Sequence, residues 1–136
     1  ENFSKAVTLS SSKEWSEEIS LNKIPQVDAI IAGSVAVTRS GKRCGKGEGY
    51  SDIEFAILRE LGHKPVPVAT TVHQLSVVED FPREAVDLPL SIIVTPDETL
   101  VVKNPFPPPD KIDWNQINEK NLEEMPILKD LKGLNY

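Results

Sequence analysis

Four glycines lie within twelve residues in the stretch "GKRCGKGEGYSD", which covers positions 41–52. Glycine at this density costs backbone entropy and is found where the main chain must approach another group closely. Glycines at positions 45, 47 and 49 remove the Cβ atoms that would keep successive amides from turning toward one bound oxygen. A helix that begins directly after them adds a positive helix end. The stretch therefore predicts a loop that binds a phosphate.

The charged residues of this stretch suggest how a phosphate would be held. Arg43 and Lys46 supply positive charge, whereas Glu48 and Asp52 repel an anion and are better suited to a Mg²⁺ ion that bridges phosphate oxygens. The spacing excludes both the P-loop, which needs a Gly-Lys-Ser/Thr end, and the G-x-G-x-x-G dinucleotide fingerprint. The alternative is a glycine-rich surface loop that binds nothing.

The loop must be positioned by the elements on either side of it. "SDIEFAILRELG" predicts a helix beginning near Ser51, because apolar residues recur every four positions from Ile53 to Leu61. Ser51 and Glu54 match a capping box, and Gly62 is a natural end. "VDAIIAGSVAVT", at positions 27–38, predicts a strand buried on both faces, followed by a turn at positions 38–43.

Three further strands are predicted at positions 66–72, 90–96 and 98–103. The order strand, glycine loop, helix, strand is typical of an α/β fold with a mostly parallel sheet and flanking helices. We expect one domain over positions 1–136, with a polar N-terminal segment at 1–26 and a proline-rich linker plus helical tail at 104–136. The tail predicts one or two short helices that separate near Pro126 and dock through Leu122, Ile127, Leu128 and Leu131.

Composition excludes several classes of protein. Fifteen basic residues against 21 acidic ones give a net charge of −6 without a basic block, so we expect no nucleic-acid surface. No apolar run approaches the roughly 20 residues of a membrane helix. The single cysteine, Cys44, excludes an internal disulfide and is typical of a reducing compartment, which predicts a cytoplasmic protein. Cys44 itself is predicted to be a small buried residue.

The glycine stretch resembles the signature of 5-formyltetrahydrofolate cyclo-ligases (methenyltetrahydrofolate synthetases), commonly written G-x-R-[LIC]-G-x-G-x-G-Y-Y-D. The similarity is greatest to the methenyltetrahydrofolate-synthetase-domain-containing branch, on "GSVAV", "GKGEGYSDIEFA" and "LEEMPILKDL". The chain departs from the pattern at Glu48, where many members carry a basic or small residue, and at Ser51, which replaces a second tyrosine. The positions that match the signature are Gly41, Arg43, Gly45, Gly47, Gly49, Tyr50 and Asp52.

The resemblance implies a three-layer fold like that of the NagB, RpiA and CoA-transferase proteins, of which this chain is the C-terminal part. It implies ATP-dependent conversion of 5-formyltetrahydrofolate to 5,10-methenyltetrahydrofolate with release of ADP and phosphate. Arg43 and Lys46 are the implied catalytic residues, Asp52 the implied Mg²⁺ ligand, and Tyr50 and His73 the implied contacts to substrate. The implied binding residues for the ATP phosphates are Gly45, Lys46, Gly47, Glu48, Gly49 and Tyr50.

Several alternatives remain open at this stage. His73 ends a predicted strand, where ligand sites of open α/β sheets gather, or it is only a hydrogen-bonded residue at the strand end. The family's early basic residues and its folate-contacting glutamate are not found here, which makes the chain either part of a longer protein or a domain that has lost part of the site. A non-catalytic nucleotide- or folate-binding domain is therefore the second hypothesis. An enzyme of the wider sugar-phosphate isomerase and CoA-transferase superfold is the third.

Overall fold

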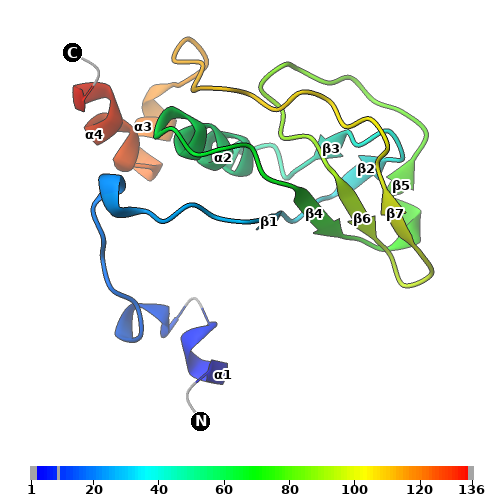
Figure 1. The fold of residues 1–136 in the computed structure, drawn as a ribbon, viewed down its shortest axis with the longest axis horizontal. Coiled ribbons are helices and arrows are strands. Elements are labelled where there is room, and N and C mark those ends of the chain that lie inside the picture. The colour runs from blue at the N-terminus through cyan, green and yellow to red at the C-terminus, as the bar shows by residue number, and fades with distance from the viewer. Residues whose placement is uncertain (1–2, 9, 135–136) are drawn as a thin grey trace.

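The computed structural model describes residues 3–8 and 10–134, and in them the strands form two sheets beside a group of helices (Figure 1). The strands are β1 (Ile30–Ile31), β2 (Ala36–Thr38), β3 (Arg43–Cys44), β4 (Val68–Thr71), β5 (Val77–Val78), β6 (Ile92–Val94) and β7 (Thr99–Val101). The α-helices are α1 (Phe3–Ala6), α2 (Tyr50–Glu60), α3 (Glu119–Glu124) and α4 (Ile127–Leu134), and short 3-10 helices cover Ser12–Glu14, Leu21–Lys23 and Gln74–Ser76.

The sheets are mixed but mostly parallel, which confirms the predicted α/β class. The larger sheet has the order β1-β4-β6-β7, with β1, β4 and β6 parallel and β7 antiparallel at the edge. The smaller sheet has the order β3-β2-β5, in which β2 pairs antiparallel with β3 and parallel with β5. The predicted strands at 66–72, 90–96 and 98–103 are confirmed as β4, β6 and β7.

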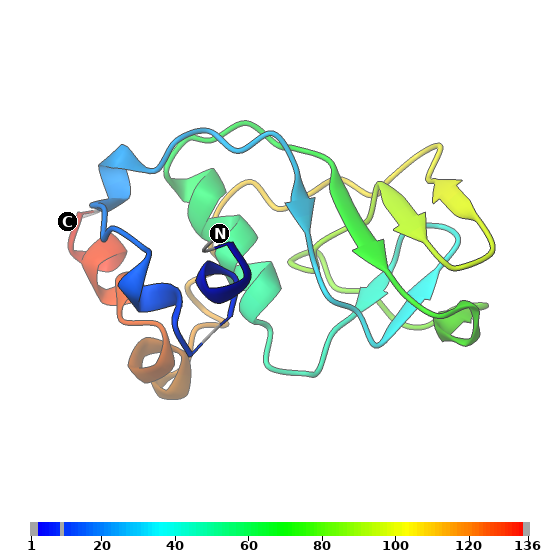
Figure 2. The same ribbon diagram turned by 90° about the horizontal axis from the view of Figure 1, so that it is seen from below.

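The two sheets pack against each other through one apolar core. Val37 of β2, Val68 of β4 and Ile93 of β6 are almost completely buried in it, and Phe55 enters it from α2. Figure 2 shows the smaller sheet stacked beneath the larger one, with the helices gathered at one end. Burying both sheets in one core fixes the β2–β3 hairpin, and with it the start of the glycine stretch.

Helix α2 separates this core from a second apolar cluster. Ala56 and Ile57 face the second cluster, where they meet Ile112, Leu128 and Leu131. The predicted docking of the tail is thereby confirmed, and α3 and α4 lie on either side of Pro126 as expected. Within the described residues, no helix combines the length and apolar character needed to cross a bilayer.

Two local predictions are wrong. The N-cap of α2 is Gly49, at φ 71° and without a side-chain hydrogen bond, so Ser51 lies inside the helix and forms no capping box with Glu54. The expected strand at 27–38 is two strands in different sheets, β1 and β2. Ile31 is 80% exposed because β1 is an edge strand with one uncovered face, not a strand buried on both faces.

Gly41 forms the turn that joins β2 to β3. Its φ is +92°, its N–H donates to the Thr38 carbonyl oxygen at 2.9 Å, and its own carbonyl oxygen accepts from the Leu90 N–H at 2.9 Å. A Cβ at this position would lie 2.7 Å from the Leu90 carbonyl oxygen. Only glycine therefore permits both the left-handed backbone at position 41 and the close approach of Leu90, which lies just before β6.

We expect Gly41→Ala to lower the free energy of unfolding by at least about 1–2 kcal/mol, since the left-handed conformation and the backbone contact both oppose a Cβ. Gly33→Ala is the matched control, because its φ is not positive and a Cβ there meets nothing within 4 Å. Urea denaturation of the two variants measures the difference. Equal losses would contradict a structural requirement for glycine at position 41.

Candidate functional site

A cavity of about 940 Å³ lies beside the glycine stretch, with positions 33–35 at one edge and three main walls from segments distant in sequence. The first wall runs from β3 through the glycine loop into the start of α2, at positions 43–53. The second comes from positions 81–87 and the third from positions 109–121. Its volume is in the range that holds a small-molecule ligand. The sequence predicted only the first wall.

The glycines of the first wall have two different roles. Gly47 (φ +93°) and Gly49 (φ +71°) adopt left-handed conformations, and a Cβ at either would meet nothing within 4 Å. They therefore let the backbone turn while leaving open space toward a ligand. Gly45 instead makes room for the protein itself, because a Cβ there would lie 3.1 Å from Arg43 Nη2.

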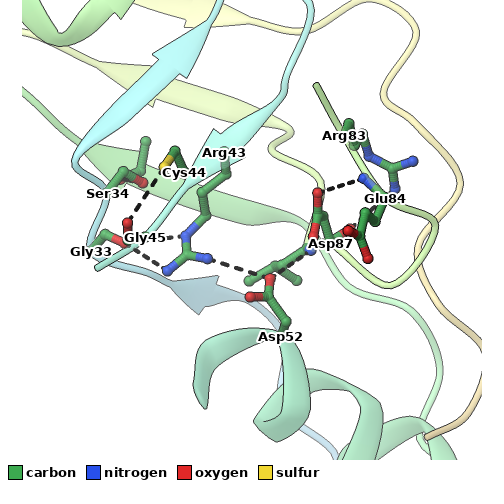
Figure 3. A network of polar contacts seen from close by, with 11 residues as sticks. Gly33, Ser34, Arg43, Cys44, Gly45, Asp52, Arg83, Glu84 and Asp87 are labelled. Atoms are coloured by element: carbon green, nitrogen blue, oxygen red, sulfur yellow. Dashed lines mark hydrogen bonds and ion pairs between the residues drawn. The ribbon is translucent and has the colours of Figure 1, made fainter. Parts of the chain in front are cut away.

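Arg43 is the buried centre of a polar network (Figure 3). Its side chain is only 6% exposed, and its Nε and Nη2 donate to the Gly33 carbonyl oxygen at 3.1 and 2.9 Å. Its Nη1 donates to Asp52 Oδ1 at 3.4 Å, and the same oxygen accepts from the Leu88 N–H at 2.8 Å. The sequence predicted that Arg43 binds phosphate and that Asp52 binds metal. In the structure the two side chains bind each other and the backbone at Gly33 and Leu88.

Burial of Asp52 raises the pKa of its carboxyl above the usual value of 3.8. The Leu88 amide and the Arg43 guanidinium act in the opposite direction, and the nearby Asp87 carboxylate acts in the same direction as burial. The charged form is therefore less favoured here than in solvent, although the network needs it.

The second and third walls are fastened by polar contacts outside the cavity. Lys42 donates to Asp80 Oδ1 at 2.6 Å and to the Phe81 carbonyl oxygen at 2.8 Å, which ties the second wall to the β2–β3 hairpin. Arg83 donates to the Pro107 carbonyl oxygen at 3.3 Å and lies 4.7 Å from the Phe106 ring centroid. The proline-rich segment is therefore held against the body at this point.

Helix α3 is attached to the glycine loop by two side-chain contacts. Lys120 Nζ lies 2.6 Å from Glu48 Oε2, and Tyr50 Oη donates to Glu124 Oε2. The hydrogen bond to Glu124 raises the pKa of the Tyr50 hydroxyl, and the hydrogen bond to Glu48 raises the pKa of the Lys120 ammonium. These contacts set the third wall directly opposite the loop.

Lys46 is the loop's available cation. It is exposed, lines the cavity, and forms no ion pair with any residue in 3–8 or 10–134. The walls otherwise carry more acid than base: Arg43, Lys46 and Lys111 against Glu48, Asp52, Glu84, Asp87 and Asp113. Because Arg43 is already paired, charge for a bound phosphate must come mainly from Lys46 and Lys111.

One carboxylate oxygen of Asp52 is already engaged by the protein. Oδ1 accepts two hydrogen bonds, one from a guanidinium whose positive charge repels a cation at this carboxylate. Within the described residues, no three His, Cys, Asp or Glu side chains are grouped so as to hold a metal. The assignment of Mg²⁺ to Asp52 therefore stays a prediction that these contacts do not support.

His73 and Cys44 differ from their expected settings. His73 does not line the cavity; its exposed side chain accepts from the Leu75 N–H at 3.2 Å, which caps a 3-10 helix. Its contact with substrate stays a prediction. Cys44 is exposed on β3 and lines the cavity, so the prediction that it is buried is wrong. It lies on the edge strand of the smaller sheet, where no neighbouring strand covers it.

The third wall is the part of the site that sequence reasoning missed. The sequence predicts that positions 109–121 belong to a linker and tail, because consecutive prolines favour extended chain without regular structure. One signal was available: Asn118 precedes the helix at the N-cap position and Asn121 follows three residues later, an arrangement similar to a capping box. It predicts an ordered helix start, which in the structure faces the cavity.

We expect Asp52→Ala to lower the free energy of unfolding by about 3 kcal/mol, since it removes the oxygen that accepts from the Arg43 guanidinium and the Leu88 N–H. Glu98→Ala is the control: it removes an ion pair with Arg39 whose side chains are 63% and 43% exposed, which predicts a loss below about 1 kcal/mol. Chemical denaturation measures both. Similar losses in the two variants would show that the buried pair has no special weight.

The raised pKa of Asp52 predicts a pH dependence. Between the ordinary carboxyl pKa of 3.8 and the raised value, the folded chain binds more protons than the unfolded chain. The contribution of Asp52 to the free energy of unfolding is therefore full below pH 3.8 and is lost as the pH rises through the raised pKa. Asp52→Asn removes this component, so its unfolding free energy falls less steeply over that range. Parallel pH profiles would contradict the raised pKa.

The chain matches known proteins over most of its length. A family model of the 5-formyltetrahydrofolate cyclo-ligase family matches residues 4–96, which include the whole glycine stretch. The chain is similar to proteins named methenyltetrahydrofolate synthase domain-containing protein: 38% identical over 134 residues in Homo sapiens, 36% over 133 in Mus musculus and 36% over 127 in Danio rerio.

These alignments cover 95%, 94% and 90% of this chain but 35%, 36% and 33% of the relatives. The chain thus spans about a third of the length of the curated relatives it matches. The family match covers well over half of its 136 residues. On that match, the chain belongs to the 5-formyltetrahydrofolate cyclo-ligase family.

Proposed function

We propose that this chain supplies the nucleotide- and folate-binding cavity of a protein that converts 5-formyltetrahydrofolate to 5,10-methenyltetrahydrofolate at the expense of ATP. The observation that carries the proposal is the open glycine loop. Gly47 and Gly49 face free space beside Lys46, which has no ion-pair partner among the described residues, and the helix that follows has no side-chain hydrogen bond at its N-cap. Backbone amides, a helix N-terminus and one lysine are the groups that bind phosphate oxygens.

The residues of this chain act by binding and orientation. Lys46 and the loop amides hold the phosphates, and Lys111 of the facing wall adds a second positive charge to the cavity. When bound, ATP supplies the phosphoryl group that makes the formyl oxygen a leaving group. Such transfer depends on positioning and charge stabilisation more than on acid–base catalysis. The buried Arg43–Asp52 pair contributes by fixing the loop and does not contact the phosphates directly.

Magnesium has a limited place in this proposal. Mg²⁺ keeps several waters and is commonly bound through substrate phosphates with one or two carboxylates. The contacts of Asp52 Oδ1 with Arg43 and Leu88 do not support that role for Asp52. No step in the proposed binding scheme passes through a protein-bound metal.

A second function, binding without turnover, is favoured by one specific observation. Both charges implied for catalysis and metal binding, Arg43 and Asp52, are engaged with each other, and acidic side chains outnumber basic ones around the cavity. Such a domain would bind the nucleotide or the folate and catalyse nothing. An assay that measures the absorbance of methenyltetrahydrofolate and the release of ADP separates the two functions, because only the enzyme forms these products.

We expect Lys46→Ala to weaken Mg-ATP binding to the full-length protein at least about tenfold, because a charge-assisted hydrogen bond contributes roughly 1.5–3 kcal/mol. Lys103→Ala is the control, since Lys103 is an exposed lysine outside the cavity. Titration calorimetry measures both affinities. If the wild type binds neither Mg-ATP nor 5-formyltetrahydrofolate, or if the two variants lose affinity equally, the proposed site is wrong.

A further inference from the structure

Asn121 is a buried polar side chain whose hydrogen-bonding capacity is only half used. It is 8% exposed and lines the cavity from α3. Its Oδ1 accepts from the Asn118 N–H at 3.0 Å, and its own N–H donates to Asn118 Oδ1 at 2.9 Å, which together form a capping box. Its Nδ2 forms no hydrogen bond with any residue in 3–8 or 10–134.

The capping box fixes which way the Asn121 amide faces. A backbone N–H can only donate, so the atom next to the Asn118 N–H must be the oxygen Oδ1. The amino group Nδ2 is therefore on the other side, with two N–H donors. In the described part of the chain, the fully buried side-chain polar atoms without a partner are Arg59 Nε, His63 Nδ1 and Arg83 Nε. Since Nδ2 is also unpartnered but not among them, it retains access to solvent.

The position of α3 brings this donor opposite the glycine loop. Lys120, the neighbour of Asn121, is paired with Glu48 of the loop at 2.6 Å, and Glu124 accepts from the Tyr50 hydroxyl. If the loop holds the phosphates of ATP, the side of the cavity opposite the loop is left for the folate and for the remainder of the nucleotide. Water can satisfy the Nδ2 donors in the free protein, so a ligand that displaces this water must supply an acceptor or lose those hydrogen bonds.

We propose that Asn121 is a substrate-binding residue whose Nδ2 donates to a carbonyl or carboxylate oxygen of the folate. This inference rests on the proposed function. The folate is the better partner of the two ligands because 5-formyltetrahydrofolate carries formyl, ring and amide carbonyl oxygens and two carboxylates, and a hydrogen bond to a carboxylate is stronger than one to the neutral ring nitrogens of adenine. Asn121 contacts substrate and takes no part in proton transfer.

The test uses Asn121→Asp in the full-length protein, which keeps the capping oxygen and replaces the donor by an acceptor. Asn115→Asp is the matched control: it makes the same change of charge six positions away, at an exposed residue that does not line this cavity. We expect 5-formyltetrahydrofolate to bind at least about tenfold more weakly to Asn121→Asp. Its affinity for Mg-ATP and its melting temperature should match those of Asn115→Asp.

A second pair of variants keeps the test valid if Asn121→Asp does not fold. Gln and Glu are both standard partners at this position of a capping box, so Asn121→Gln and Asn121→Glu preserve the helix start. They differ in the presence of the amide donor. We expect Asn121→Gln to bind 5-formyltetrahydrofolate several-fold more tightly than Asn121→Glu at equal melting temperature.

The outcomes separate this inference from the function on which it rests. A wild-type protein that binds no folate overturns the proposed function itself. A wild type that binds folate, with Asn121→Asp or the Gln/Glu pair binding it equally well, overturns the role of Asn121 alone. A loss of affinity for Mg-ATP alone in Asn121→Asp overturns the assignment of Nδ2 to the folate.

Discussion

The fold around the cavity depends on one buried ion pair, between Arg43 and Asp52. It joins the chain after β1, through the Gly33 carbonyl, to β3, to the first turn of α2 and to the backbone at Leu88. The Arg43 side chain is almost completely removed from water and that of Asp52 is 23% exposed. Such a pair is tolerated when its remaining donors and acceptors are also bonded, which is the case for most of them here. The pair lies behind the glycine loop, so the loop's two ends, at β3 and α2, are held at a fixed separation.

This constraint divides the residues of the glycine stretch into two groups. Gly41, Arg43, Gly45 and Asp52 build the loop, although the last three also line the cavity: a Cβ at either glycine would meet a neighbouring group, and the two charges are paired with each other. Gly47, Gly49 and Lys46 also line the cavity, and a Cβ at either glycine would meet nothing within 4 Å in the described chain. A sequence signature of this kind therefore mixes positions that build the loop with positions that can touch a ligand, and only a structure separates them.

The elements that could be predicted from the sequence are those determined by local patterns. The four-residue spacing of Ile53, Ile57 and Leu61 predicts α2 and the face that packs on the tail. Pro126 predicts the break between α3 and α4. The start of α2 was misassigned because a serine and a glutamate three apart match a capping box whether or not the serine is at the N-cap. The division of positions 27–38 and the pairing of Arg43 with Asp52 depend on contacts between distant segments, which periodicity does not encode.

The third wall shows why the candidate site itself was only partly predictable. Its ion pair with the loop, Lys120 to Glu48, joins side chains that are 57% and 50% exposed, and such pairs contribute at most about 1 kcal/mol. The wall is instead held by burial, through Ile117, Leu122 and Met125 packed against the second apolar cluster. The amphipathic pattern of those residues predicts a packed helix and does not predict a ligand site. Apolar packing brings α3 to the cavity, the exposed pairs set its orientation, and the amide of Asn121 then faces the loop from more than seventy residues away in sequence.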